Sequence, residues 1–325
     1  MKTLSALFIT GLSLLAAQAA GQTIRTVDTF KMDRFVPAGN YSGIVGLNDG
    51  VSFAVVDDKC ATDGFAVFQI KLNPKTGAVE TVAHEGSRLS GLPNRDEEGI
   101  AYNPKTHFVY IAGEKDNRIL EYTCEGKTTQ KSTPCLLPNG KANSGLEALC
   151  CDSTRQWLWA VEENNGRDTS AIIQIGLPSL QELRRIPYPL DPSAAKPSAR
   201  WHAKGVSSVL VMDSTHLLVL ERELYVPKKK IGAWTHVKIY TCPVMTECGL
   251  KDRIAAQDKR LLWECRTKLN LTKRSFANYE GMCWGPTLSD GRRTILLIAD
   301  SQNRYKGFLH DWLKVLLVEP DSFRK

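Results

Sequence analysis

Five short apolar segments of this chain begin with the same kind of two-residue step, in which a serine or glutamate precedes a small residue. The five steps are Ser42-Gly43, Glu98-Gly99, Glu147-Ala148, Ser207-Ser208 and Glu280-Gly281. They recur 49 to 73 residues apart. A period of this size indicates tandem structural repeats, each one supersecondary unit that buries its apolar face against its neighbours.

A second apolar segment follows each step and ends, about fifteen residues on, at an acidic residue. The five ends are Asp57, Glu114, Glu162, Glu221 and Asp300. The segments are short and rich in β-branched and aromatic residues, and turn signals such as Ser289-Asp290-Gly291 separate them. Many short strands suit a sandwich, a barrel or a propeller, but the fixed repeat favours a β-propeller of four-stranded antiparallel blades.

Five repeats are visible, and the wide interval between Ser207 and Glu280 leaves room for a sixth, degenerate blade. Apolar segments also lie outside the repeats, at residues 23–30 and 312–318. Pairing these two segments in one blade would close the ring and leave no exposed strand edge. The prediction is therefore an all-β propeller that is closed by N- and C-terminal strands.

The first 21 residues have the features of a signal peptide. Lys2 precedes an apolar run from Leu4 to Ala17, and Ala17-Gln18-Ala19 is a small-residue cleavage pattern. The run is too short to span a membrane, and no later segment approaches the necessary length. We expect a secreted or extracellular protein, periplasmic in a bacterium, with residues 22–325 forming one propeller domain.

Nine cysteines in an exported chain favour disulfides, because oxidising compartments let them persist. Cys124 with Cys135 and Cys242 with Cys248 are close enough in sequence to staple local hairpins. The partners of Cys60, Cys150, Cys151, Cys265 and Cys283 do not follow from spacing. Asn40 and Asn270 begin glycosylation sequons, which matter only in a eukaryotic host.

Strand direction brings the repeated polar residues together. Adjacent strands of a blade are antiparallel, so the start of the first and the end of the second lie at the same end of the sheet. We therefore expect the five step residues to share one mouth of the channel with the five acids. Calcium, which takes six to eight oxygen ligands, would neutralise such a ring.

Glu98, Glu147 and Glu280 are the first candidates for metal ligands, because innermost strands approach the axis most closely. The other residues expected at this mouth, as a binding set, are Asp57, Glu114, Glu162, Ser207, Glu221, Arg222 and Asp300. None of the six histidines recurs in the repeats, so a transition metal has no soft ligands there. The alternative is that the acids only cap strand ends and accept backbone hydrogen bonds.

Catalytic residues are not evident. The chain has no GxSxG elbow, HExxH motif or phosphate-binding glycine loop. His202 lies five residues before Ser207, but a solitary loop histidine is usually structural. The net charge of +7 is compatible with an anionic ligand. Aromatic and basic residues do not interleave as in nucleic-acid binding surfaces, so no nucleic-acid partner is expected.

At these motifs the chain resembles the phytase-like family, which is named for the esterase-like activity of phytase. The closest matches are Leu218-Val219-Leu220-Glu221-Arg222-Glu223 and Tyr279-Glu280-Gly281-Met282-Cys283-Trp284. The resemblance implies an exported propeller with an esterase or phosphatase role. The chain differs from the family pattern in its many cysteines and in Ser301-Gln302-Asn303, where an acidic ending is more usual.

Two functions therefore remain open. The first is a calcium-assisted hydrolase that acts on a small anionic ester or phosphoester at the acidic mouth. The second is a non-catalytic secreted binding propeller in which calcium only ties the blades together. In either case we expect a monomer.

Overall fold

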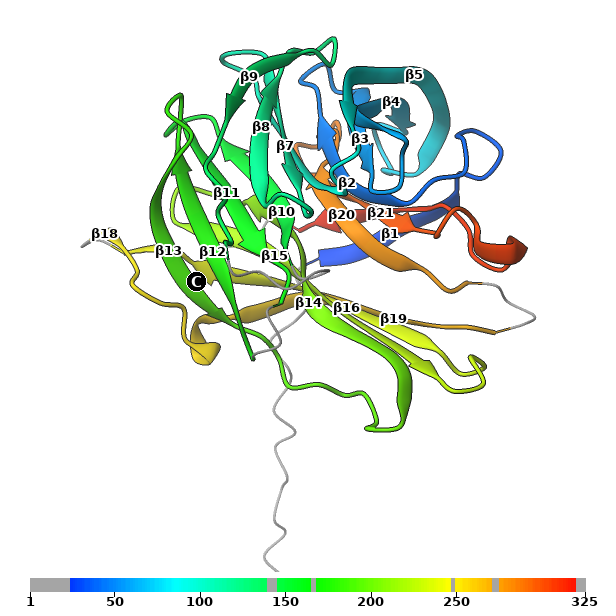
Figure 1. Ribbon diagram of the computed structural model, residues 1–325. Coiled ribbons are helices and arrows are strands. Elements are labelled where there is room, and N and C mark those ends of the chain that lie inside the picture. Colours follow the sequence, from blue (N-terminus) through cyan, green and yellow to red (C-terminus); the bar gives the residue numbers. More distant parts are fainter. Residues whose placement is uncertain (1–23, 139–144, 165–167, 247–248, 271–274, 320–325) are drawn as a thin grey trace, which may run out of the picture.

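The computed structural model describes residues 24–138, 145–164, 168–246, 249–270 and 275–319. In this part of the chain, twenty strands form five four-stranded antiparallel sheets, arranged as the blades of a propeller (Figure 1). The predicted fold class is thereby confirmed. The signal-peptide prediction, residues 1–21, lies outside the described residues. Among those described, no helix has the length and apolar character needed to cross a membrane.

The first four blades follow chain order from the innermost strand outward. The first blade consists of β2 (Tyr41–Gly46), β3 (Ser52–Asp57), β4 (Thr62–Leu72) and β5 (Val79–Pro93). The second consists of β6 (Glu97–Asn103), β7 (Phe108–Gly113), β8 (Arg118–Tyr122) and β9 (Thr128–Ser132). The third consists of β10 (Leu146–Asp152), β11 (Trp157–Glu162), β12 (Thr169–Gly176) and β13 (Gln181–Pro189).

The fourth blade has the longest inner strands. It consists of β14 (Ala199–Val211), β15 (His216–Pro227), β16 (Trp234–Pro243) and β19 (Arg260–Lys268). The interval between β16 and β19 holds the small hairpin of β17 (Met245–Thr246) and β18 (Gly249–Leu250) and the 3-10 turn η1 (Ala256–Asp258). This interval accounts for the wide spacing before Glu280, and it contains no sixth blade among the described residues.

The fifth blade closes the ring. It consists of β20 (Asn278–Trp284), β21 (Thr294–Asp300), β22 (Trp312–Val318) and, on its outer edge, β1 (Ile24–Lys31). The 3-10 turn η2 (Tyr305–Gly307) lies between β21 and β22. Strand β1 pairs with β22 from Ile24–Val318 to Lys31–Trp312, so the two ends of the ring meet in one sheet, as predicted (Figure 1).

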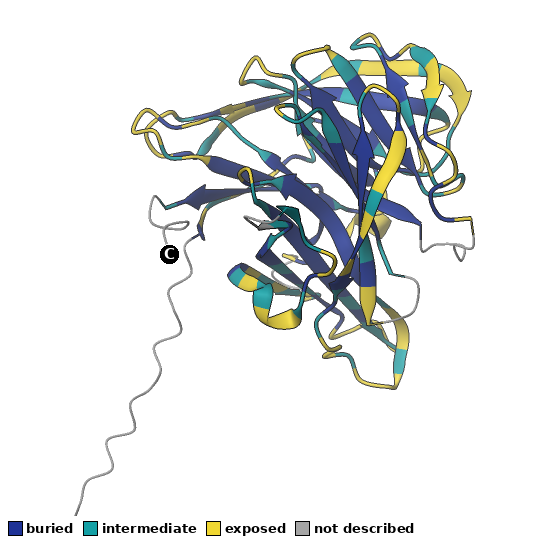
Figure 2. Cartoon of the chain, turned by 90° about the vertical axis from the view of Figure 1, so that its left-hand side faces the viewer, coloured by how far each residue is buried: buried dark blue, intermediate teal, exposed yellow. Residues whose placement is uncertain are grey.

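The apolar core is divided among the interfaces between neighbouring blades. The described residues form five buried clusters, one for each interface; Leu218 and Leu297, for example, belong to the cluster between the fourth and the closing blade. The strands at the centre of the propeller are largely buried (Figure 2). Every residue of the innermost strand β6 is buried. The second strands, such as β3 and β7, are also buried on both faces, which explains why they are nearly continuous apolar runs.

Candidate functional site: a carboxylate cavity at the channel mouth

All five innermost strands carry a β-bulge at the repeated step. Pairing with the second strand of the blade shifts register at that position, which leaves one residue of each step without a partner: Ser42, Glu98, Glu147, Ser207 and Glu280. A bulge bends the strand locally and re-aims the side chain of the extra residue. The sequence repeat is therefore the signature of a repeated bulge.

The small residue that forms the second half of each step permits close packing of neighbouring innermost strands. A Cβ atom on Gly99 would lie 2.8 Å from the backbone nitrogen of Leu149 in the next blade. A Cβ atom on Gly43 would lie 2.5 Å from the carbonyl oxygen of Glu98. Real side chains do not tolerate such approaches, so the channel wall needs a residue without a side chain at these points.

The bulges surround a cavity of about 760 Å³ at one mouth of the channel. Its acidic lining includes the exposed Asp168, which precedes β12, and seven further carboxylates: one from the first blade and two each from the second, third and closing blades. These seven residues are Asp58, Glu98, Glu114, Glu147, Glu163, Glu280 and Asp300. The fourth blade contributes Arg222, and Lys59 and Lys204 also reach the lining.

The predicted site residues separate into two groups. Six of them line the cavity: Glu98, Glu114, Glu147, Arg222, Glu280 and Asp300. Asp57, Glu162, Ser207 and Glu221 lie outside its lining. Because side chains alternate between faces along a strand, a position one residue away points to the other face.

In the first, third and fourth blades, the residue that reaches the cavity is the one that follows the predicted acid. The predicted acids pair with the residue just before each bulge: Asp57 with the first residue of β2, Glu162 with the first residue of β10, and Glu221 with Val206. Their successors Asp58, Glu163 and Arg222 line the cavity. The sequence pattern pointed to the acidic end of each strand, and it could not distinguish between neighbouring charged residues.

Glu221 instead belongs to a buried network between the third and fourth blades. Its carboxylate accepts hydrogen bonds from the Tyr188 hydroxyl at 2.7 Å and from the backbone N–H of Asp191 at 3.1 Å. It also forms an ion pair with Lys259. Its role in the described structure is to join two blades.

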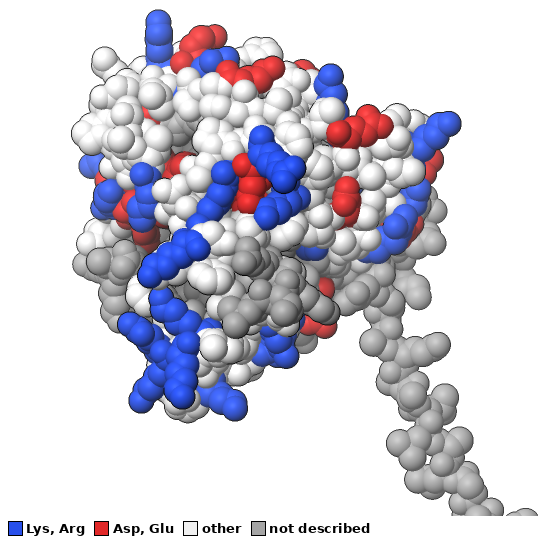
Figure 3. All heavy atoms as spheres, turned by 90° about the vertical axis from the view of Figure 1, so that its right-hand side faces the viewer, with Lys and Arg blue, Asp and Glu red and all other residues white. Residues whose placement is uncertain are grey.

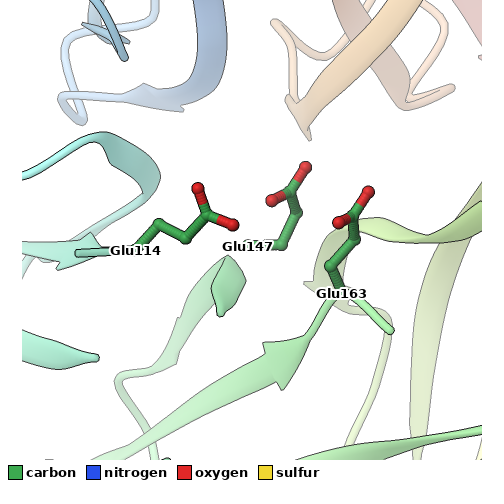
Figure 4. A group of neighbouring side chains, drawn as sticks. All are labelled: Glu114, Glu147 and Glu163. Atoms are coloured by element: carbon green, nitrogen blue, oxygen red, sulfur yellow. The ribbon is translucent and has the colours of Figure 1, made fainter. Parts of the chain in front are cut away.

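Three carboxylates of the cavity come especially close together. Glu114, Glu147 and Glu163 each offer an oxygen, and these oxygens lie within 4.8 Å of one another. They extend toward a common point from the ends of β7 and β11 and from β10 (Figure 4). Only Glu147 belongs to the predicted metal set of Glu98, Glu147 and Glu280.

Arg222 is the buried cation of the cavity. Its guanidinium lies 2.8 Å from the carboxylates of both Glu163 and Glu280, and 3.6 Å from that of Glu147. The Nε atom of Arg222 is buried without a hydrogen-bond partner. Arg222 therefore bridges the third, fourth and closing blades at the floor of the cavity.

Burial and like charges raise the pKa values of the cavity acids. The pKa of Glu98 is raised well above its usual value by burial and by Glu147 and Asp58. Burial raises the pKa of Glu280 to about 8 against the opposing charge of Arg222, and burial raises that of Asp300 to about 7. A cation placed among these groups would favour their ionised forms.

A histidine near the cavity was not predicted as functional. His202 lies in the lining with Ser193, and its Nε2 atom is 2.9 Å from Glu223 Oε1 and 3.3 Å from Ser193 Oγ. The serine hydroxyl lies 2.6 Å from the same Glu223 oxygen, to which it donates. Serine and carboxylate share one ring nitrogen, whereas a catalytic triad uses both. The sequence feature that could have pointed to this group is Glu223, which lies in the most charged strand of the repeats.

Only one of the two predicted disulfides, Cys124 with Cys135, lies wholly within the described residues. Both are free thiols in the described structure, so the proposed pairing is not confirmed. The Cys124 thiol lies 3.1 Å from the backbone carbonyl of His107 and packs against the core between the first two blades. Cys242 is buried and free, and Cys248 lies outside the described residues.

The two sequons differ in position. Asn40 is half-buried, and its side chain contacts Asp58 at the cavity. Asn270 is exposed at the end of the fourth blade, while the threonine of its sequon lies outside the described residues. A glycan on Asn40 would crowd the cavity, and Asn270 stays the more accessible candidate.

Comparisons with known proteins give one family and several solved structures that are similar to this chain. No curated protein matches the chain. Similar solved structures include a luciferin-regenerating enzyme, at 10% identity and a TM-score of 0.46 over 89% of this chain and 94% of that chain. Another is a member of the duf4221 family from Bacteroides vulgatus, at 8% identity and a TM-score of 0.43 over 91% and 98%. The family described as phytase-like, esterase-like activity of phytase, matches residues 36–302, and the chain therefore belongs to this family.

Proposed function

We propose that the carboxylate cavity binds calcium and that the protein hydrolyses a small anionic ester, foremost a phosphoester, at this ion. The observation that carries the proposal is the convergence of seven carboxylates on one cavity in which Arg222 is the buried cation. Uncompensated buried carboxylates are costly, so such a cluster favours a bound cation.

The residues present suit a hard cation. Every acidic ligand offered is an oxygen, and calcium accepts six to eight of them in flexible geometry. The Oδ1 atom of Asp58 is buried without a hydrogen-bond partner, which leaves a donor atom available. Glu114, Glu147 and Glu163 are the best-placed ligands. Glu98 and Asp58 lie nearby, since, besides burial, the charges of Glu147 and Glu114 help to raise the pKa of Glu98, and Asp58 helps to raise that of Glu114.

A calcium ion bound there would polarise an ester or phosphoryl oxygen and supply an activated water. The chain's own residues would hold the ligand. Arg222 presents a planar guanidinium suited to carboxylate or phosphate, and Lys59 and Lys204 add positive charge at the rim. His202, held by Glu223, lies on the same wall and is available to move a proton.

A second candidate function is a non-catalytic binding propeller with a structural ion. The observation that favours it is that the three clustered glutamates come from two neighbouring blades, so the ion would tie these blades together. Ser193 and His202 also lack the geometry of a nucleophile and its base.

One experiment tests both candidates. Chelator-treated protein is titrated with calcium in a calorimeter, and the same samples are assayed with 4-nitrophenyl phosphate and 4-nitrophenyl acetate. Calcium binding together with calcium-dependent turnover supports the hydrolase. Calcium binding with a raised melting temperature and no turnover of either ester supports the binding propeller. No calcium binding contradicts both.

Export is a further part of the proposal. The apolar run of residues 4–17 and the cleavage pattern at residues 17–19 support secretion. Expression of the full chain followed by N-terminal sequencing of the medium or periplasm tests it. A start near residue 22 is expected, and a cell-retained chain that begins at Met1 would contradict it.

A further inference from the structure

A second cavity, of about 370 Å³, opens beside the carboxylate cavity and has a different character. We call it the apolar groove. Its main side chains are Trp201, Leu224, Val226, Phe276, Tyr305 and Leu309. Its volume is within the range of small-molecule sites, which are typically lined by apolar and aromatic residues with a few polar groups.

The apolar groove is continuous with the carboxylate cavity. Five residues line both: Trp201, Leu224, Asn278, Asp300 and Gln302. The two cavities therefore share a wall in which Asp300 and Asn278 mark the polar side, and Trp201 and Leu224 the apolar side. A ligand whose charged end lies among the carboxylates would extend directly into the groove.

One wall of the apolar groove is an extension of the fourth blade. Beyond its bulge, β14 continues to pair with β15 from Gly205–Arg222 outward to Ala199–Pro227. The equivalent pairing in the second blade ends at Glu97–Gly113, next to the bulge. The extra length carries Trp201 out beyond the channel, where it is 65% exposed.

The other wall comes from the closing blade and is joined to the first. Tyr305 of η2 is 36% exposed, and its hydroxyl lies 3.0 Å from the Nζ atom of Lys230, in the turn that follows β15. The same Nζ atom lies 4.9 Å from the centre of the Tyr305 ring. Two large aromatic side chains thus face solvent at the rim of a cavity, an arrangement typical of a binding site.

The charge around the apolar groove is positive at its outer end. Arg200 and Lys230 belong to its lining. On the face drawn in Figure 3, lysine and arginine side chains gather in the lower part of the molecule. The ends of the fourth-blade strands lie at the same height in Figure 1. The aromatic and aliphatic lining between this end and the carboxylate cavity complements an uncharged organic group.

We propose that the apolar groove binds the aromatic or other apolar group of an ester whose anionic end lies at the cation in the carboxylate cavity. This inference rests on the proposed function and narrows its ligand class to amphiphilic monoesters, such as aryl phosphates. A ligand that is anionic on every side would leave Trp201, Leu224 and Phe276 without an apolar partner.

The test compares three probes by calorimetry in the presence of calcium: 1-naphthyl phosphate, inorganic phosphate and 1-naphthol. Burial of an aromatic ring is expected to make 1-naphthyl phosphate bind about tenfold tighter than phosphate, or more. Trp201→Ala should abolish this advantage. Tyr305→Ala should reduce the advantage and leave phosphate affinity unchanged, because Tyr305 lines the groove and not the carboxylate cavity. Ile231→Ala is the matched control, because Ile231 is 68% exposed on the same blade and does not line the groove.

The outcomes separate the two proposals. Equal calcium-dependent binding of 1-naphthyl phosphate and phosphate overturns the groove proposal and leaves the cation site standing. Binding of 1-naphthol that is lost in Trp201→Ala, without calcium-dependent binding of either phosphate, supports an apolar site and overturns the phosphoester assignment. An equal loss in Trp201→Ala and Ile231→Ala overturns the assignment to this groove.

Discussion

The guanidinium of Arg222 lies 2.8 Å from the carboxylate of Glu280, and both side chains are buried. The fourth blade thus presents a cation at the position where the four other blades present an acid. The neighbouring Glu163 and Glu147 lie at 2.8 Å and 3.6 Å from the same guanidinium. Arg222 therefore partly neutralises the acids of the third and closing blades, whereas the acids of the first and second blades have no such buried partner from Arg222.

Replacement of Arg222 by methionine should strongly destabilise the protein. Removal of one partner from a buried ion pair leaves an unpaired charge and typically costs about 3–5 kcal/mol of unfolding free energy. Urea unfolding in the presence of chelator measures the loss. Calcium should recover part of it, because a bound cation replaces the lost positive charge.

Arg25→Met is the matched control for Arg222→Met. Arg25 lies 2.8 Å from Glu319, but both side chains are substantially exposed, so the loss should stay below about 1 kcal/mol. Similar losses in the two variants would contradict the bridging role of Arg222.

Two adjacent glutamates should differ in their effect on calcium binding. Glu163 lines the cavity and belongs to the clustered trio, whereas Glu162 lies outside the lining. Glu163→Gln should weaken calcium binding about tenfold or more, since even indirect partners of metal ligands typically contribute that much. Glu162→Gln should leave calcium affinity unchanged. Calorimetric titration of both variants with calcium measures the difference. An effect confined to Glu162→Gln would contradict the conclusion that Glu163, and not Glu162, reaches the cavity.

Gly99→Ala should destabilise the second blade. The added Cβ atom would meet backbone atoms of Ala148 and Leu149 at 2.8–2.9 Å, and backbone cannot move aside as a flexible side chain can. Overpacking of this kind typically costs about 1–3 kcal/mol. Gly46→Ala in β2 is the control, because its Cβ atom would have a nearest neighbour at an ordinary 3.5 Å. Equal thermal stability of the two variants would contradict the tight packing at the step.

Asp191 should make the protein sensitive to acid. Burial opposes its ionisation, but bonds from Lys238 and Tyr240, both at 2.5 Å, and from Lys259 at 2.9 Å hold its pKa well below the usual range. A carboxyl whose pKa is lower in the folded state stabilises that state above the unfolded pKa, about 4. This contribution is lost as the pH falls below that value.

The Asp191→Asn variant checks this contribution. It should be less stable at pH 7, by about 1.5–3 kcal/mol for bonds to a charged group, and its stability should fall less between pH 4 and pH 2. Asp252→Asn is the control, because Asp252 is 89% exposed and pairs only at the surface with Arg184. An unchanged pH profile in Asp191→Asn would contradict the assignment.

Several parts of the fold were accessible from sequence because they depend on local pattern. The repeated steps predicted the innermost strands, and the apolar segments at both ends predicted the closure by β1 and β22. The number of blades was less certain, since the hairpin β17–β18 lengthens one interval without adding a blade. The disulfide between Cys124 and Cys135 is not confirmed, and closeness in sequence does not by itself align two side chains.

The sequence by itself determined the repeat, the strands and the presence of Glu98, Glu147 and Glu280 at one mouth of the channel. Only the tertiary structure decided which of two neighbouring charged residues, such as Glu162 and Glu163, reaches the cavity. The reason is that a bulge at each step changes the register by one residue, and a change of one residue exchanges the two faces of a strand. The apolar groove likewise exists only after folding, because Trp201 and Tyr305 come from blades whose walls meet through tertiary packing.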